Sequence, residues 1–429
     1  MGEGLEGSPL LLDPVSASAM SGVLPGLALS GEPIAFTPTR AAGLQRLERF
    51  AARTGRHYAN TRNYDFGAER RTNVSALSPW IRHRLITEEE VLIRVLASHR
   101  LGQAEKFVQE VFWRTYFKGF LEQRPSVWSM YQFELVKSYQ ALESDPSLQL
   151  TYSQAVSGAT GIDCFDHWAT ELIRTGYLHN HARMWMASIW IFTLRLPWEL
   201  GADFFLRHLL DGDPASNTLS WRWVAGLHTK DKTYLARPEN IEKYTNGRFS
   251  PTGLARVADP LIEAADHPRR PIAPCNASPS GPYLLLLTEE DLCSYDIMPH
   301  EPAGVLGLLA THGRSPQPIG EAAQRFAKDA LRGILASTDV QPQSADDWSV
   351  PILAAAQRIG VRTVATAYPP IGPVRARLDR AESKLVEAGV LLHRVRRNLD
   401  SIAWPYADAG FFKLKTKIPT ILANLNLLR

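Results

Sequence analysis

Two short segments in the middle of the chain combine polar and aromatic side chains at spacings that could serve chemistry. Asn180 and Arg183 lie three residues apart, so a helix places them on one face. Burying an amide and a guanidinium without partners is costly. Asp211 or Asp213 of the second segment can supply a partner. The pattern fits either a salt bridge that fixes two helices or a polar site that holds a bound molecule.

Composition limits the chemistry that this site can perform. The net charge is only +3, so any contact with nucleic acid must rely on a local basic patch. The three cysteines are far apart and form no CxxC pair, which argues against a zinc site, a disulfide framework or an iron–sulfur cluster. We therefore expect no metal. The cysteine usage, the acidic N-terminus and the lack of a long apolar run predict a cytoplasmic protein without a membrane segment.

The chain divides into four parts by composition and periodicity. Residues 1–40 are rich in Gly, Pro and Ser and predict an irregular leader. Helical spacing of apolar residues continues through 41–246, which predicts a helical domain. Residues 247–282 hold seven prolines and predict a linker or strapping loop. Residues 283–429 form the fourth part.

Within the helical domain, the periodicity predicts two consecutive helices over 162–175 and 179–196. The apolar stretch 184–200 is too short for a membrane span, because Arg195 interrupts it and Pro197 ends it. We expect it to form a buried core helix.

The last part alternates short apolar runs with helical stretches, which is typical of a parallel sheet covered on both faces. No GxGxxG follows any of the runs, so the usual dinucleotide fingerprint is absent. We predict an α+α/β chain, with an all-helical domain followed by a smaller, Rossmann-like parallel-sheet domain. The expected strands and helices cover 283–287, 304–310, 320–334, 363–367, 374–388 and 390–395.

The two polar segments resemble the FAD-binding domain of the photolyase and cryptochrome superfamily. The family pattern His-Asn, two residues, Arg-Met occurs at 179–184, although His181 replaces the family's Arg. The pattern Asp-Gly-Asp, three residues, Asn, three residues, Trp-x-Trp occurs at 211–223 with identical spacing. Upstream, 75–79 resembles the family's Ser-x-Leu-Ser-Pro turn, and 160–166 resembles its Thr-Gly helix start.

The resemblance implies that the chain binds FAD. Tyr58 and the turn residues Ser75, Leu77 and Ser78 would hold phosphates at the start of a helix, where free N–H groups favour anions. Arg183 and Asp211 would form a pair against the isoalloxazine. Asp213 would accept from flavin N3–H, and Asn217 would face N5. The implied cofactor-binding residues are Tyr58, Ser75, Leu77, Ser78, Arg183, Asp211, Asp213 and Asn217.

The resemblance also implies a pocket for a flipped-out DNA lesion, with aromatic walls and a polar handle. Its residues are Glu110, Trp113, Asn180, Met184 and Trp223. The implied DNA contacts are Arg62, Arg114 and Lys230.

An electron relay to the flavin is the third implication. Trp221 and Trp198 match the two inner members of the family's three-tryptophan relay. The outer member would fall near Asp145, where the chain has no Trp. Another aromatic side chain can take its place, or the relay is short.

The resemblance thus favours a monomeric enzyme like deoxyribodipyrimidine photo-lyase, in which blue light drives electron transfer from reduced FAD to a pyrimidine dimer in damaged DNA. The alternatives are a cryptochrome-like photoreceptor with a protein partner, and a flavoprotein without photochemistry. Family members place their α/β domain before the helical one, whereas here it follows. This order leaves open whether an antenna chromophore binds.

Overall fold

The structure is a computed structural model that describes residues 33–230, 232–263 and 265–428. Most of the predicted leader lies outside the described residues. The helical half contains α1 (Arg40–Ala51), α2 (Arg56–Thr61), η1 (Ala68–Arg70), α3 (Ser78–Arg82), α4 (Glu88–Ser98), α5 (Leu101–Gln123), α6 (Ser126–Ser144), α7 (Pro146–Ser157), α8 (Asp163–Thr175), α9 (Asn180–Ser188), η2 (Ile189–Thr193), α10 (Trp198–His208), α11 (Pro214–Val224) and α12 (Pro238–Tyr244).

The second half contains the sheet and its covering helices. Its elements are β1 (Leu284–Thr288), η3 (Ser294–Ile297), β2 (Gly304–Leu309), η4 (Thr311–Arg314), α13 (Glu321–Leu335), β3 (Gln343–Ser344), α14 (Ser349–Ile359), β4 (Thr363–Ala367), α15 (Pro373–Glu387), β5 (Leu391–Val395), α16 (Asn398–Ala403), η5 (Trp404–Tyr406), α17 (Phe411–Lys415) and α18 (Ile418–Asn424).

The predicted fold class is confirmed: helices fill the first half, and a parallel sheet with helices fills the second. The strand order is β3-β2-β1-β4-β5, and every pair is parallel. The two-residue strand β3 escaped prediction because Gln343 and Ser344 are exposed and carry no apolar signal.

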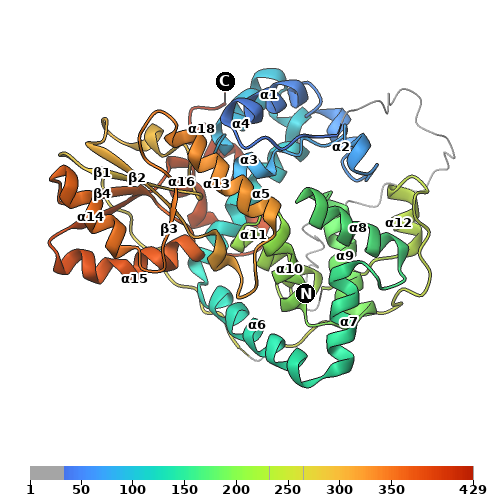
Figure 1. Ribbon diagram of the computed structural model, residues 1–429. Helices are drawn as coiled ribbons and strands as arrows, with labels where there is room; N and C mark the ends of the chain where they lie inside the picture. The colour runs from blue at the N-terminus through green and yellow to red at the C-terminus, as the bar shows by residue number, and fades with distance from the viewer. Residues whose placement is uncertain (1–32, 231, 264, 429) are drawn as a thin grey trace, which may run out of the picture.

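Alternate leucines of β1 face different cores. Leu284 and Leu286 pack in a smaller core with residues of α14 and α15. Leu285 and Leu287 join the large core, which also holds residues of α13 and of the helical half. The period of two residues in a strand therefore gives the sheet two covered faces. Figure 1 shows the sheet with α14 and α15 at one side of the molecule, and α7, α8, α9 and α12 at the other.

Local signals define the helix ends near the site. Thr87 and Glu90 form a capping box at the start of α4. The Asp166 carboxylate accepts hydrogen bonds from the Thr160 hydroxyl (2.7 Å) and the Gly161 N–H (2.9 Å). This closes the turn that leads into α8, so the motif at 160–166 has a clear role in orienting that helix.

The predicted continuous helices over 179–196 and 184–200 are wrong in their second part. The α-helix α9 ends at Ser188, and the chain then makes a π-helical turn in which Leu194 N–H donates to Ile189 C=O (2.9 Å). Arg195 adopts a left-handed φ of 56°, and α10 starts only after Pro197. The run from Ile189 to Phe192 is β-branched and aromatic, and such residues lose rotamer freedom in a regular helix.

The stretch between the two halves contains no helix or strand among its described residues, 247–263 and 265–282. Backbone hydrogen bonds tie it to both halves: Leu261 to Ala225 (3.0 Å), Arg270 to Gln123 (2.7 Å) and Asn276 to Arg394 (3.1 Å). Among the described residues, no helix is long and apolar enough to cross a membrane.

Candidate functional site: a polar cavity in the helical half

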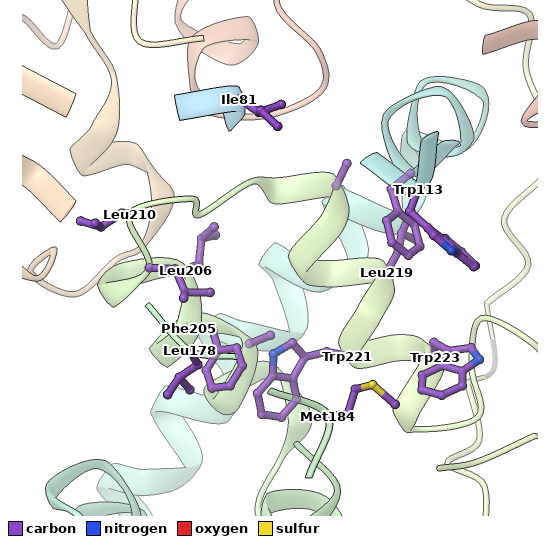
Figure 2. Close-up of a cluster of buried hydrophobic side chains, with 14 of the residues drawn as sticks. Ile81, Trp113, Leu178, Met184, Phe205, Leu206, Leu210, Leu219, Trp221 and Trp223 are labelled. Carbon is purple, nitrogen blue, oxygen red and sulfur yellow. The ribbon is translucent and has the colours of Figure 1, made fainter. Parts of the chain in front are cut away.

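A cavity of about 280 Å³ lies among α2, α3, α5, α9 and α11. All residues predicted to bind the cofactor or the substrate line this cavity. Figure 2 shows that Trp221 and Trp223 project from one helix, α11, while Trp113 comes from another. The sequence therefore identified the wall of one site from motifs that are up to about 165 residues apart, Tyr58 to Trp223.

One end of the cavity is formed by the turn before α3. Ala76 has a left-handed φ of 52°, which is unusual for a residue with a side chain. Arg46 holds the turn by donating to the carbonyl oxygens of Ser75 (2.7 Å) and Val74 (2.9 Å). Ser78 begins α3, and the first N–H groups of a helix lack partners within the helix. The turn thus offers hydroxyl and N–H donors to the cavity.

Arg183 and Asp211 form a bidentate ion pair in the cavity wall. Arg183 Nη1 and Nη2 donate to the two carboxylate oxygens at 3.1 and 2.9 Å. Burial alone would raise the pKa of Asp211, but Arg183 and a hydrogen bond from Ser78 lower it. A planar bidentate pair of this kind is a rigid surface on which a ring system can rest.

Asp213 is the second buried carboxylate of the wall. It accepts from the Ala215 N–H (3.0 Å) as the N-cap of α11, and it pairs with Arg114 (2.9 Å). Burial raises the pKa of Asp213, but Lys118, Arg114 and Arg82 outweigh this effect and bring it to about 2. Asp213 is therefore a fixed hydrogen-bond acceptor near neutral pH. Asn217 follows one turn later, and its amide donates to the Ala202 carbonyl (2.8 Å).

The residues predicted to contact a substrate also line the cavity. Glu110 forms an ion pair with Arg62. Asn180 Nδ2 lies 3.7 Å from the sulfur of Met184. Trp223 packs against Tyr234, with ring centroids 5.6 Å apart. These residues therefore already have partners within the protein.

Trp113 is covered on one face by the second half of the chain. Its ring stacks on Phe411 of α17, with centroids 3.7 Å apart and an angle of 13° between the planes. Only 7% of Trp113 is exposed, although it still lines the cavity. The helices after the sheet therefore help to build the site.

Unpartnered polar atoms in the cavity wall test whether a polar cofactor fits. Among the described residues, His179 Nε2, His181 Nδ1, Arg62 Nε and Trp221 Nε1 are buried and make no hydrogen bond. Buried polar atoms are normally paired, so this wall suits a ligand with many polar groups. With the hydroxyl-rich turn at one end and three ion pairs in the wall, the donor set fits FAD.

The predicted DNA contacts occupy two different environments. Arg62, at the end of α2, and Arg114, on α5, lie in the cavity wall. Each is paired with a carboxylate. Lys230 is exposed and does not line the cavity. Each arginine pairs through one Nη atom, so its remaining N–H groups are the donors that a phosphate contact would use.

The two predicted relay tryptophans are also placed differently. Trp221 lines the cavity, whereas Trp198 lies at the start of α10, outside it. The ring of Trp221 contacts Trp190 (6.2 Å between centroids) and Phe205 (5.0 Å), while Trp198 contacts Tyr131 (5.6 Å).

Two further residues of the wall and its support were not predicted as cofactor residues, although one of them, Lys118, is among the basic residues near the motifs that suit a phosphate contact. Tyr177 lines the cavity under the guanidinium groups of Arg71 and Arg183. Lys118 is fully buried near Asp213. Its position on α5, four residues after Arg114 and therefore on the same face, was the available signal.

Comparison with known proteins shows what the middle of the chain is similar to. Residues 107–260 match the model of the family described as the FAD binding domain of DNA photolyase. Deoxyribodipyrimidine photo-lyase of Streptomyces griseus is 35% identical over 156 residues, which cover 36% of this chain and 32% of that protein. The enzyme of the same name from Synechococcus sp. is 30% identical over 195 residues, covering 44% and 39%. The chain thus matches only about a third to two fifths of the length of these relatives.

Solved structures with local likeness include a Synechocystis cryptochrome, which is 26% identical with a TM-score of 0.41 over 50% of this chain and 45% of that one. A class III photolyase from Agrobacterium tumefaciens is 25% identical with a TM-score of 0.40, over 49% and 43%.

Proposed function

We propose, from the match of residues 107–260 to the FAD binding domain of DNA photolyase, that this protein uses blue light to repair pyrimidine dimers in DNA. The match over residues 107–260 supports the predicted FAD-binding domain. The cavity in the helical half is the proposed FAD site, and damaged DNA is the proposed partner.

One observation carries the proposal: the implied cofactor residues and the implied substrate residues line the same cavity. A structural salt bridge between two helices would explain Arg183 and Asp211 alone. It would not explain why Tyr58, Glu110 and Trp223, which come from other elements, face the same space.

The chain's own residues would bind and orient the cofactor. Ser75 and Ser78 supply donors for phosphates at one end of the cavity, and the ion pair of Arg183 with Asp211 supports the ring system. Asp213 stays ionised and can accept from a ring N–H. When FAD is bound and reduced, the chemistry that it supplies is light-driven donation of one electron to the dimer, which returns the electron after ring opening.

A dimer can reach the cavity only if the lesion leaves the DNA stack. Trp113 and Trp223 would then wall the flipped bases, and Glu110 would accept from them. Arg62 pairs with only one oxygen of Glu110, which leaves the other oxygen to accept from the lesion, and the remaining N–H groups of Arg62 could meet a phosphate.

The direct test is illumination of the reduced, FAD-loaded protein with a dimer-containing oligonucleotide. The proposal predicts loss of the dimer in the light and none in a dark control. Unchanged dimer content in the light would refute repair.

A cryptochrome-like photoreceptor is the second candidate, and two observations favour it. Phe411 covers one face of Trp113, and Arg62 neutralises Glu110. A sensor with a protein partner has no need for a free lesion pocket.

Lesion-specific binding separates the two functions. A repair enzyme prefers dimer-containing DNA to undamaged DNA, and Trp113→Ala abolishes that preference. For a sensor, both DNAs bind alike and the substitution changes nothing. Trp128→Ala removes a buried Trp that does not line the cavity, so it controls for general loss of stability.

A further inference from the structure

The ring of Trp221 is the point where an electron relay would meet the cavity. Trp221 lines the cavity and is 2% exposed, and Figure 2 shows it beside Phe205. The glycine at position 201 lets it pack closely against a second indole. A Cβ there would lie 2.3 Å from the Trp221 ring and 2.9 Å from the Trp190 ring. Trp190 is thus the indole in contact with Trp221, at 87° and 6.2 Å between centroids.

The π-helical turn positions Trp190. This residue lies within Ile189–Thr193, and its indole N–H donates to the Pro197 carbonyl at 2.9 Å. Such turns are frequent at functional sites. A hydrogen bond to a carbonyl oxygen also stabilises positive charge on the donor ring. The irregular turn therefore gives Trp190 both a fixed orientation and a favourable environment for losing an electron.

Two tyrosines continue this path outward. Tyr152 contacts Trp190 edge-on, with centroids 6.1 Å apart, and Tyr139 contacts Tyr152 at 6.3 Å. The two hydroxyl oxygens are 3.5 Å apart. Trp190 is fully buried, whereas both tyrosines are partly exposed. The path therefore runs from the cavity wall to a place that a small reductant can reach.

The outer tyrosine has a proton acceptor. Tyr139 Oη donates to Asp203 Oδ2 at 2.7 Å, and Arg207 holds the same oxygen at 2.8 Å. Burial raises the pKa of Asp203 and makes it a stronger base. Burial and Asp203 also raise the pKa of Tyr139, so the phenol keeps its proton until it is oxidised.

The route through Trp198 lacks a hydrogen bond from its tyrosine to a carboxylate, among the described residues. Trp198 contacts Tyr131, which contacts Trp128 at 5.1 Å, and both are almost completely buried. The Tyr131 hydroxyl is buried without a hydrogen-bond partner among the described residues. Asp203 and Glu199 are near enough to raise the pKa of Tyr131, but among the described residues neither carboxylate accepts a hydrogen bond from its hydroxyl, so its proton has no direct path to a base.

We propose that Trp190, Tyr152 and Tyr139 relay electrons to Trp221, with Asp203 accepting the phenolic proton of Tyr139. This relay rests on the proposed function in one respect, namely that flavin occupies the cavity. Under light, Trp221 gives one electron to the oxidised flavin, and an electron from Tyr139 refills it through Tyr152 and Trp190. Tyr139 becomes a neutral radical as its proton passes to Asp203. A thiol in solution then gives a hydrogen atom to Tyr139, and Asp203 releases its proton to water.

Transient absorption and electron paramagnetic resonance of the oxidised, FAD-loaded protein test the relay. Illumination should produce a tyrosyl radical, which Tyr139→Phe and Trp190→Phe remove. Trp198→Phe and Tyr131→Phe are the matched controls and should leave the radical in place. The stoichiometry of bound FAD and the unfolding midpoint show that each variant is folded.

A tyrosyl radical that persists in Tyr139→Phe, or that disappears in Trp198→Phe, would overturn the relay. Failure of dimer repair with a preserved tyrosyl radical would refute the proposed repair function and leave the relay standing. If the protein takes up no FAD, both fall.

Discussion

At the scale of single residues, the site depends on carboxylates that stay ionised inside the protein. Asp213 has a pKa of about 2 although it is buried, since Lys118, Arg114 and Arg82 surround it. A charge held in this way costs more to remove than a surface charge, because its partners are left unpaired. The same carboxylate caps α11, so it links helix geometry to cavity chemistry.

We predict that Asp213→Asn lowers both stability and FAD retention. The amide keeps a cap acceptor but leaves Arg114 without its ion-pair partner and removes one of the carboxylates near Lys118, which should cost about 3–5 kcal/mol of unfolding free energy. Urea unfolding and the flavin absorbance of the purified protein measure the two effects. Glu48→Gln breaks an exposed ion pair with Arg94 and should change little. Equal effects of the two substitutions would contradict the assignment of Asp213 as a buried, charge-paired carboxylate of the cavity wall.

Two cavity histidines predict a pH dependence. Burial lowers the pKa of His179 to about 4 and that of His181 to about 3. Between about pH 6.5 and 4 the unfolded chain binds protons that the folded protein does not, so stability falls as the pH drops, by up to ~1.4 kcal/mol per pH unit and histidine. Unfolding curves across this range should flatten in His181→Asn and stay unchanged in His300→Asn, which alters an exposed side chain. A slope that His181→Asn does not alter would exclude this cause.

At the scale of elements, α17 supports the cavity wall from the far end of the chain. Phe411 stacks on Trp113, whereas its neighbour Phe412 is 40% exposed. We predict that Phe411→Ala lowers the unfolding free energy by about 3 kcal/mol, since a buried ring is lost. Phe412→Ala on the same helix is the matched control and should have little effect. If urea unfolding shows similar losses of unfolding free energy in both variants, the stacking of Phe411 on Trp113 does not stabilise the protein more than an exposed ring does.

Elements and site residues could be predicted from the sequence wherever a local pattern of residue types indicates them. The strand at 363–367 agrees to the residue, because its short length and its position between two helical stretches favour a buried strand. The break after Ser188 was missed, because the apolar run continues through the π-helical turn. The stacking of Phe411 on Trp113 joins residues about 300 positions apart, and no pattern along the chain encodes that contact.

At the scale of the whole molecule, the carboxyl edge of the sheet docks on the helical half. Ligands of open parallel sheets normally bind at this edge. Here Glu290 pairs with Arg82 at 2.6 Å, and Asp291 pairs with Arg84 at 3.1 Å and with Arg397 at 2.6 Å. These side chains are buried, so the edge serves as an interface between the two halves.

Asp291→Asn should loosen this docking, because two buried arginines lose a shared partner. We predict a loss of about 3–5 kcal/mol in unfolding free energy and faster trypsin cleavage after Arg269, which lies in the connecting stretch. Asp347→Asn breaks an exposed pair with Lys384 and is the control. Unchanged cleavage in Asp291→Asn would mean that other contacts hold the halves together.

The most direct test of the account is the visible absorption spectrum of the purified protein, before and after reconstitution with FAD. The account predicts a flavin band at one FAD per chain, and loss of that band in the double variant Arg183→Ala, Asp211→Ala. A folded protein that shows no flavin band even after reconstitution would contradict the central claim that the cavity is an FAD site.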